Sequence, residues 1–106
     1  MGNPALCSYY SSNYSYIVYT DGLIHQWGTY DKGSDTRSVF STAIFPVQYT
    51  SEGSYMINIA GVRAGDGNFV GGIGVSKRYS YSAYMGWYGL SESDLARYLK
   101  WETLGY

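Results

Sequence analysis

The residues of this chain that could do acid–base or metal chemistry are one histidine and eight carboxylates. His25 lies within a run of strand-forming residues, so it gives no support for a Ser/His/Asp or Cys/His/Asn arrangement. A single histidine cannot build a metal site in one chain, although three copies of His25 around a symmetry axis could. The simpler interpretation is a strand histidine that is hydrogen-bonded in or near the core. We expect no metal and no cofactor.

Paired carboxylates are the other catalytic possibility, because glycoside hydrolysis needs two of them flanking one bond. Asp31 with Asp35, or Asp66 with an acid of a neighbouring loop, could pair in space. Most of the acids stand in polar turns, however, where a solvated or turn-capping carboxylate is the ordinary case. We therefore expect that the protein is not an enzyme.

Sugar binding has more support, because aromatic side chains stack on the C–H faces of sugar rings. Residues 77–88 alternate tyrosines with small polar residues, and their candidate receptor contacts are Arg78, Tyr79, Tyr81, Tyr84, Trp87 and Tyr88. The polar loops expected at 31–38 and 64–68 add the candidates Arg37, Asp66 and Asn68, since binding residues concentrate on loops. The alternative interpretation makes some of these aromatic residues structural. In it, Tyr79, Tyr81 and Trp87 are core, and Tyr84 and Tyr88 lie at a subunit interface.

The composition is typical of a small β-protein. The chain has 106 residues, which fits one domain, and it contains 14 Tyr, 14 Gly and 3 Trp. A net charge of −1 with 14% charged residues argues against a nucleic-acid partner and against intrinsic disorder. No apolar run approaches the length of a membrane span, so we expect no membrane insertion. Cys7 is the single cysteine, so no disulfide forms within one chain.

Short strand-like runs separated by Gly-containing turns predict an all-β, antiparallel sandwich or barrel. The clearest local signal is Asp21-Gly22 between two such runs, which is typical of a type I′ hairpin turn. Residues 31–38 are polar and contain a glycine, so we expect a loop there. Further strands are expected at 39–45, 54–64, 69–76 and 77–90. Residues 91–106 are ambiguous, and we expect one helical turn followed by a final strand.

Alternation predicts which side chains share a face of each strand. After the hairpin turn, His25 and Trp27 share one face, and Ile24 and Gln26 share the other. In the strand at 54–64, a mildly polar face could pack on a neighbouring subunit; it consists of Met56, Asn58 and Ala60. In the last strand one face carries Leu99, Trp101 and Thr103.

Three motifs follow one another along the chain: GLIHQWG at 22–28, IFPVQY at 44–49 followed by YMI at 55–57, and WETLGY at 101–106. Over residues 16–106 the chain therefore resembles the gp53-like C-terminal domain of phage tail fibre proteins. That family shows a G-hydrophobic-x-x-Q-W-G strand, a hydrophobic-F-P-x-x-aromatic strand end and a closing W-x-x-hydrophobic-G strand. The chain departs from the pattern at Glu102-Thr103, where small or apolar residues are more usual, and in the polar stretch 91–97.

The resemblance implies an antiparallel β-sandwich that assembles as a homotrimer at the distal end of a virion tail fibre. It also implies binding to a bacterial surface receptor, often lipopolysaccharide or another envelope glycan. Residues 1–13 would be a lead-in segment that joins the rest of the fibre, and residues 14–106 the receptor-binding tip domain. The motif residues themselves look like packing residues of the core, namely Trp27, Phe45, Pro46, Tyr49 and Trp101.

Three functions follow from these patterns. The leading hypothesis is an adhesin that binds an envelope glycan without chemistry. The first alternative is a structural cap that trimerises and closes the fibre, while the second is a depolymerase that cleaves envelope polysaccharide.

Overall fold

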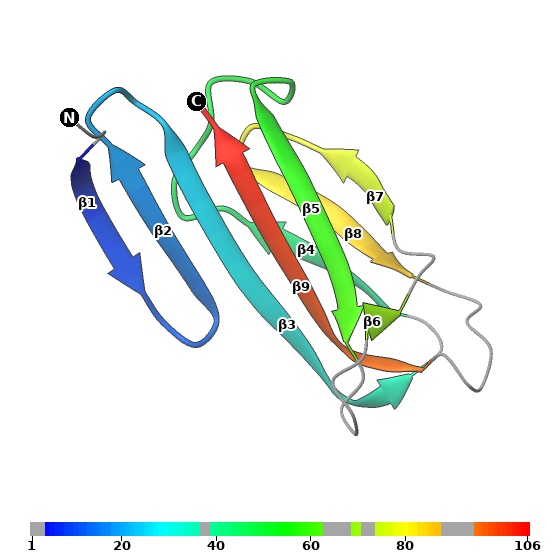
Figure 1. Cartoon of the computed structure of the whole chain (residues 1–106). Helices are drawn as coiled ribbons and strands as arrows, with labels where there is room; N and C mark the ends of the chain where they lie inside the picture. The colour runs from blue at the N-terminus through cyan, green and yellow to red at the C-terminus, as the bar shows by residue number, and fades with distance from the viewer. Residues whose placement is uncertain (1–3, 37–38, 63–68, 71–73, 88–94) are drawn as a thin grey trace.

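The computed structural model describes residues 4–36, 39–62, 69–70, 74–87 and 95–106, and these residues form strands and turns with no helix (Figure 1). The strands are β1 (Ala5–Tyr10), β2 (Tyr14–Tyr19), β3 (Ile24–Thr36), β4 (Val39–Ile44), β5 (Tyr55–Val62), β6 (Phe69–Val70), β7 (Gly74–Arg78), β8 (Ser82–Trp87) and β9 (Ala96–Gly105). The predicted all-β class is confirmed.

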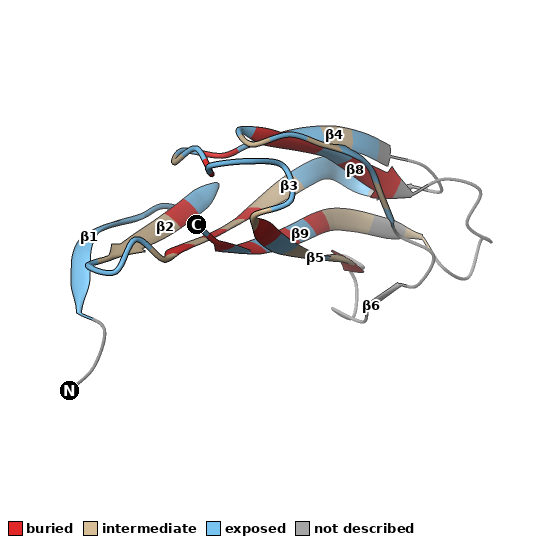
Figure 2. Ribbon diagram, turned by 90° about the horizontal axis from the view of Figure 1, so that it is seen from above, coloured by how far each residue is buried: buried red, intermediate tan, exposed pale blue. Residues whose placement is uncertain are grey.

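The strands form two antiparallel sheets. A six-stranded sheet has the order β1-β2-β3-β9-β5-β6, and a three-stranded sheet has the order β4-β8-β7. The two sheets lie one above the other, and buried side chains of both meet between them (Figure 2). This confirms the predicted sandwich. The smaller sheet does not extend over the β1–β2 hairpin, which lies to one side of the two-layered part (Figure 2).

The β2–β3 hairpin turns at Asp21-Gly22 as predicted, but the turn type differs. The Tyr19 amide donates to the Leu23 carbonyl oxygen at 2.8 Å, and the Gly22 amide donates to the Tyr19 carbonyl oxygen at 2.9 Å. Gly22 has a φ of 94°, whereas no non-glycine residue of the described chain has a positive φ. A type I′ turn requires positive φ at both central residues, so the type I′ prediction is wrong. Four residues, 20–23, lie between β2 and β3, and of these only Gly22 has a positive φ.

Strand β3 continues through Thr36, so the loop predicted at 31–38 is wrong for residues 31–36. Its pairing with β9 shifts register between Asp31 and Thr36, which marks a bulge. Gly33 takes a φ of 97° there, and its amide donates to the Asp31 carboxylate at 2.8 Å. The same carboxylate binds the Arg97 guanidinium of β9, with 2.7 Å between Nε and Oδ1. Asp31 and Gly33, which are typical of a loop, thus belong to β3, and the Asp31 carboxylate connects β3 to Arg97 of β9.

The strand predicted at 77–90 is divided by a turn at residues 79–81, so that prediction is wrong there. β7 and β8 form a hairpin, closed by the Tyr79 amide donating to the Ser82 carbonyl oxygen at 2.7 Å. The strand predicted at 69–76 is also divided, because β6 pairs with β5 whereas β7 pairs with β8 in the other sheet. The strands predicted at 39–45 and 54–64 correspond to β4 and β5.

The final strand is confirmed as β9, the central strand of the larger sheet between β3 and β5. Its predicted inner face is correct, since Leu99, Trp101 and Thr103 are all buried. The helical turn expected before it falls largely on residues 88–94, which lie outside the described residues.

The three sequence motifs meet at one place between the sheets. Gln26 is fully buried, and its side-chain amide donates to the Val47 carbonyl oxygen and accepts from the Val47 amide, both at 2.8 Å. Tyr49 donates or accepts a 2.6 Å hydrogen bond with the Thr103 hydroxyl. A Cβ atom at residue 28 would lie 2.5 Å from the Trp101 indole ring, so only glycine fits there. Thr103, a departure from the family pattern, is therefore the hydrogen-bond partner of a buried tyrosine.

Two of the five predicted core residues lie elsewhere. Phe45, Tyr49 and Trp101 are buried and belong to one cluster, as predicted. Trp27 is wrong as a core residue, because it shares the outer face of β3 with His25, and its ring lies 4.6 Å from the imidazole. Pro46 is exposed; it follows the end of β4, where a missing amide costs nothing.

The segment predicted as a lead-in, residues 1–13, contains β1, which pairs with β2 from Ala5 to Tyr10. All six residues of β1 are exposed. β1 is therefore an edge strand with little packed on either face.

Candidate functional site

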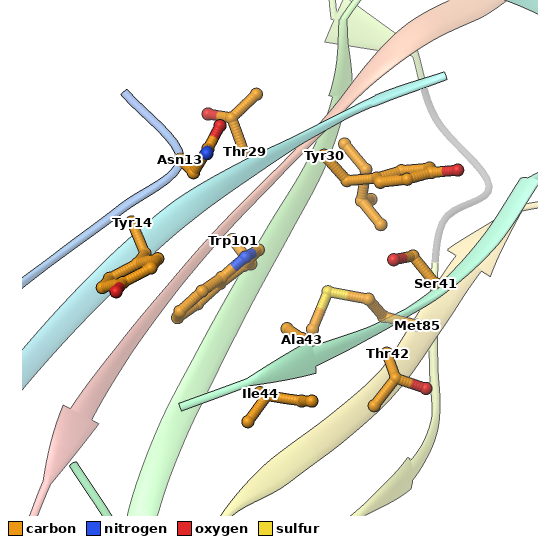
Figure 3. A pocket seen from close by; sticks show the side chains of 11 residues that line it. Asn13, Tyr14, Thr29, Tyr30, Ser41, Thr42, Ala43, Ile44, Met85 and Trp101 are labelled. Carbon is orange, nitrogen blue, oxygen red and sulfur yellow. The ribbon is translucent and has the colours of Figure 1, made fainter. Parts of the chain in front are cut away.

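A crevice of about 170 Å³ opens between the two sheets beside the edge strand β4 (Figure 3). The larger sheet contributes aromatic rings to it from three neighbouring strands, namely Tyr14 of β2, Tyr30 of β3 and Trp101 of β9. The smaller sheet contributes residues 41–44 of β4 and Met85 of β8. The crevice is completed by Asn13, Thr29 and Leu99.

The crevice has a buried floor and an exposed rim. Met85 is fully buried and Trp101 is 7% exposed, whereas Tyr14 and Ile44 at the rim are 40% and 73% exposed. Trp101 is held by Phe45, whose ring lies 5.5 Å away, and by the close approach to Gly28. The ring at the bottom of the crevice is therefore fixed by the core, and one side remains open to solvent.

The lining combines rings with neutral polar groups. The polar side chains include the Asn13 amide and the Ser41 hydroxyl group, and none of the lining residues is charged. Such a mixture suits a ligand with both C–H faces and hydroxyl groups. No acid, histidine or cysteine is among the described residues that line the crevice.

Two of the candidate tyrosines form a pair at the β7–β8 turn. The rings of Tyr79 and Tyr81 stack with centroids 5.6 Å apart, and they are 40% and 53% exposed. Two hydrogen bonds hold the backbone of the turn in place. The Tyr81 carbonyl oxygen accepts from the Phe45 amide, and the Tyr79 carbonyl oxygen accepts from the Tyr55 hydroxyl. The alternative that these two tyrosines are core residues is therefore wrong.

Arg78 and Tyr84, the other described candidates, lie in different settings. The Arg78 guanidinium donates to the carbonyl oxygens of Glu52 and Tyr55 and lies 4.3 Å from the centre of the Tyr55 ring. Its charge therefore serves to join β7 to β5. Tyr84 is exposed on the outer face of the smaller sheet, stacked on Phe40 with ring centroids 5.4 Å apart.

Several candidates cannot be placed. Arg37, Asp66, Asn68 and Tyr88 lie outside the described residues, as does the loop predicted at 64–68. Trp87 belongs to β8, where it pairs with Val39, and its side chain is not among those described.

The outer face of the larger sheet carries a second, shallower groove. His25 and Glu102 face each other across β3 and β9, with 2.8 Å between Nε2 and Oε2, and Asn58 of β5 lines the same groove. Met56, at the neighbouring end of β5, is 72% exposed. Glu102, the other departure from the family pattern, is thus an outward-facing partner of the only histidine. His25 is hydrogen-bonded within a strand as predicted, but its place in or near the core is wrong, because it lies on the outer face of β3.

The acid pairs that the sequence suggested cannot be followed here, because Asp66 lies outside the described residues and the side chain of Asp35 is not among those described. The Asp31 carboxylate faces Arg97, whose hydrogen bonds, together with the Gly33 amide, hold the pKa of Asp31 below its ordinary value. No group of three or more metal-ligating side chains occurs in the described part of the chain. Within those same residues there is no helix long and apolar enough to cross a membrane.

Sequence reasoning missed the crevice because its residues are not local in the sequence. Tyr14, Tyr30, Ser41 and Trp101 come from four different strands. The sole signal is the high tyrosine content of residues 9–19, which marks the region without showing what it faces.

Comparison with known proteins places the fold. No protein-family model and no curated protein matches the chain. A C-terminal fragment of the R1 pyocin fibre of P. aeruginosa is similar with a TM-score of 0.66 at 16% identity, over 99% of this chain and 29% of that chain. An N-truncated R1-type pyocin tail fibre gives 0.60 at 19% identity, over 99% and 88% of the two chains. An N-truncated R2-type pyocin tail fibre gives 0.62 at 20%, over 100% and 39%.

These similarities define the class of the fold, which is that of pyocin tail fibre fragments. The tail-fibre fold expected from the three motifs is confirmed by a comparison that does not depend on the motifs. The chain spans less than a third of the R1 pyocin fragment, so what the rest of such a fibre does is a separate matter.

Proposed function

We propose that this chain is the receptor-binding tip domain of a phage tail fibre and that it binds an envelope glycan, such as lipopolysaccharide, without cleaving it. The observation that carries the proposal is the similarity to pyocin tail fibres over essentially the whole chain. The phage virion is the corresponding location, with this domain at the distal end of the fibre.

Exposed aromatic residues support a glycan ligand. Ring pairs lie on the surface at Tyr79–Tyr81 and Phe40–Tyr84, and the crevice beside β4 adds a mixed aromatic and hydroxyl lining. Aromatic surfaces bind neutral polyhydroxyl ligands with little loss of side-chain entropy. Each such site is weak, and repetition around a trimer increases the overall strength of attachment through avidity.

A homotrimer is part of this proposal. A 106-residue sandwich buries a modest fraction of its surface, so assembly with other copies would stabilise it. The outer groove at His25, Asn58 and Glu102, with the exposed Met56 beside it, is available for such contacts. The unpaired edge of β1 is a second surface of this kind.

Adsorption to cells tests the function. The labelled full chain is mixed with a panel of bacterial strains that includes P. aeruginosa, the cells are pelleted, and the bound fraction is measured. We expect saturable binding to a subset of strains that lipopolysaccharide from the same strains competes away. Binding to no strain at all would overturn the proposal.

A structural cap is the second candidate, favoured by the groove on the outer sheet face. The two functions differ in how they respond to surface changes. The double variant Tyr79→Ser/Tyr81→Ser should weaken adsorption if the domain is an adhesin, whereas Tyr106→Ser, at another exposed tyrosine, should not. If neither these nor other surface aromatic substitutions affect adsorption or host range, the cap is the correct function.

A further inference from the structure

We propose that the crevice beside β4 binds one uncharged pyranose ring, and so forms a monosaccharide subsite of the glycan-binding domain. This inference rests on the proposed function and adds to it a location and a ligand class. The crevice was not among the sites that the sequence suggested.

Ring geometry is the first argument. The rings of Tyr14, Tyr30 and Trp101 come from adjacent strands and line one hollow, with the Met85 thioether between the two sheets at its floor (Figure 3). A pyranose has an apolar C–H face that packs on such a ring. The buried indole supplies a fixed platform, and the half-exposed Tyr14 supplies a wall that the ligand covers on binding.

Polar groups of the lining are the second argument. On the β4 side, the Ser41 hydroxyl group, on the same face as Met85, can donate and accept, as sugar hydroxyl groups require. The Asn13 amide, near Tyr14 on the side of the larger sheet, can do the same. β4 is an edge strand that pairs with β8 on one side. In the part of the chain that the structure describes, no strand pairs with residues 41–44 on the other side, so backbone amide and carbonyl groups of residues 41–44 can also bind hydroxyl groups.

The charge and size of the crevice define the ligand class. None of the lining residues carries a charge, and burying an acidic sugar there would leave its carboxylate unpaired. The volume of about 170 Å³ is smaller than the roughly 300 Å³ at which pockets for larger ligands begin, so one ring fits rather than several. Because no charge takes part, binding should be independent of salt concentration.

Nuclear magnetic resonance of the full chain tests this directly. Methyl pyranosides of glucose, galactose, mannose and N-acetylglucosamine are titrated to about 50 mM, far above the Kd on the order of 1 mM expected for a ligand of one ring. We expect at least one of them to shift the Trp101 indole N–H signal saturably. Methyl glucuronide, which differs from methyl glucoside by a carboxylate, should bind at least about tenfold more weakly.

Variants confirm where the sugar binds. Ser41→Leu adds a branched side chain to the crevice and should weaken binding at least about tenfold. Ser76→Leu, the same change at an exposed position of β7, should leave binding unchanged. Tyr14→Ala, at the exposed rim, should weaken binding by about two- to tenfold through loss of one stacking face.

The crevice proposal is overturned if no pyranoside shifts the Trp101 signal, or if Ser41→Leu and Tyr14→Ala both bind as the unchanged chain does. The outcome differs from failure of the proposed function. If cells adsorb the chain but no pyranoside shifts the Trp101 signal, the adhesin proposal stands and the crevice proposal is wrong. If a pyranoside shifts the Trp101 signal saturably but no strain adsorbs the chain, the sugar site stands and the adhesin proposal is wrong.

Discussion

The side chain of Gln26 connects β3 of the larger sheet to the segment that follows β4 of the smaller sheet. It lies at the inner face of β3, fully buried, and its amide makes two 2.8 Å hydrogen bonds with the backbone of Val47, just after β4. The motif residues that reveal the resemblance thus contact one another, and their spacing in the sequence reflects packing. Two of them, Ile44 and Trp101, also line the crevice.

Replacing Gln26 by leucine leaves both backbone groups of Val47 without a partner inside the protein. Each unsatisfied buried group costs about 1–3 kcal/mol, so we expect Gln26→Leu to lower the free energy of unfolding by about 2–4 kcal/mol. Urea unfolding followed by tryptophan fluorescence measures it. The control is Gln48→Leu, whose exposed side chain bonds only Ser80, and it should change stability by less than about 0.5 kcal/mol. Equal effects in the two variants would contradict this role of Gln26.

Tyr49 makes the fold sensitive to alkaline pH. Burial raises the pKa of its hydroxyl above the ordinary value of 10.0, because the charged form would be desolvated. The folded state therefore keeps this proton more tightly than the unfolded state does. The resulting stabilisation is complete below pH 10.0 and is lost as the pH rises through the raised pKa.

We expect the free energy of unfolding to fall as the pH rises above about 10, and to fall less steeply in Tyr49→Phe. Urea titrations at several pH values measure both slopes. Tyr106→Phe, at an exposed tyrosine, should keep the steep dependence. A Tyr49→Phe slope identical to that of the unchanged chain would show that this hydroxyl does not contribute.

At the scale of elements, the β1–β2 hairpin differs from the rest of the larger sheet. β9 is bordered by two strands and covered by the smaller sheet, whereas β1 is bordered by β2 alone and is exposed throughout. Local opening requires little free energy where few apolar contacts are lost. The tyrosines of this hairpin stack on one another, as the rings of Tyr9 and Tyr14 do at 5.5 Å, and this is its main packing.

Hydrogen exchange should separate the two strands in an isolated chain. We expect the amides of β1 that pair with β2 to exchange at least about a hundredfold faster than those of Leu99 and Trp101 in β9. Amide exchange followed by nuclear magnetic resonance resolves each residue. Protection of β1 as strong as that of β9 would contradict this account of the hairpin.

Alternation in the sequence predicted β5 and the side chains that share each face of β5 and β9, although residues 91–106 also fitted a helical spacing. Sequence patterns gave wrong predictions where the hydrogen-bond or ion-pair partners of a polar residue or a turn are distant in the sequence. Asp31 and Gly33 are typical of a loop, yet the pairing of β3 with Arg97 and Tyr98 extends the strand through them. The turn at 79–81 contains no glycine or proline, and hydrogen bonds to residues 45, 49 and 55 fix it.

The candidate site could be predicted only in part, for the same reason. Tyr79, Tyr81 and Tyr84 are exposed aromatic residues as the tyrosine–serine pattern suggested. Trp27 was assigned to the wrong face because a large apolar ring usually marks the core, whereas here the buried face of β3 carries Ile24 and Gln26. The crevice is formed by residues of several different strands, so it could not be predicted without the tertiary structure.

At the scale of the whole molecule, the chain is elongated, with principal extents of 47 × 25 × 21 Å. The two-layered part accounts for one end and the uncovered β1–β2 hairpin for the other (Figure 2). Both the hairpin and the outer groove at His25 and Glu102 leave surface that a second copy could bury.

The central claim is that this chain is a tail-fibre domain, and its mass in solution tests that claim most directly. Sedimentation equilibrium of the full chain at several concentrations should give a species near three times the chain mass of 11.8 kDa. The trimer should persist on dilution, because each copy contributes to the stability of the others. A stable monomer at every concentration would contradict the account and would leave a small sugar-binding module on a fibre-like fold.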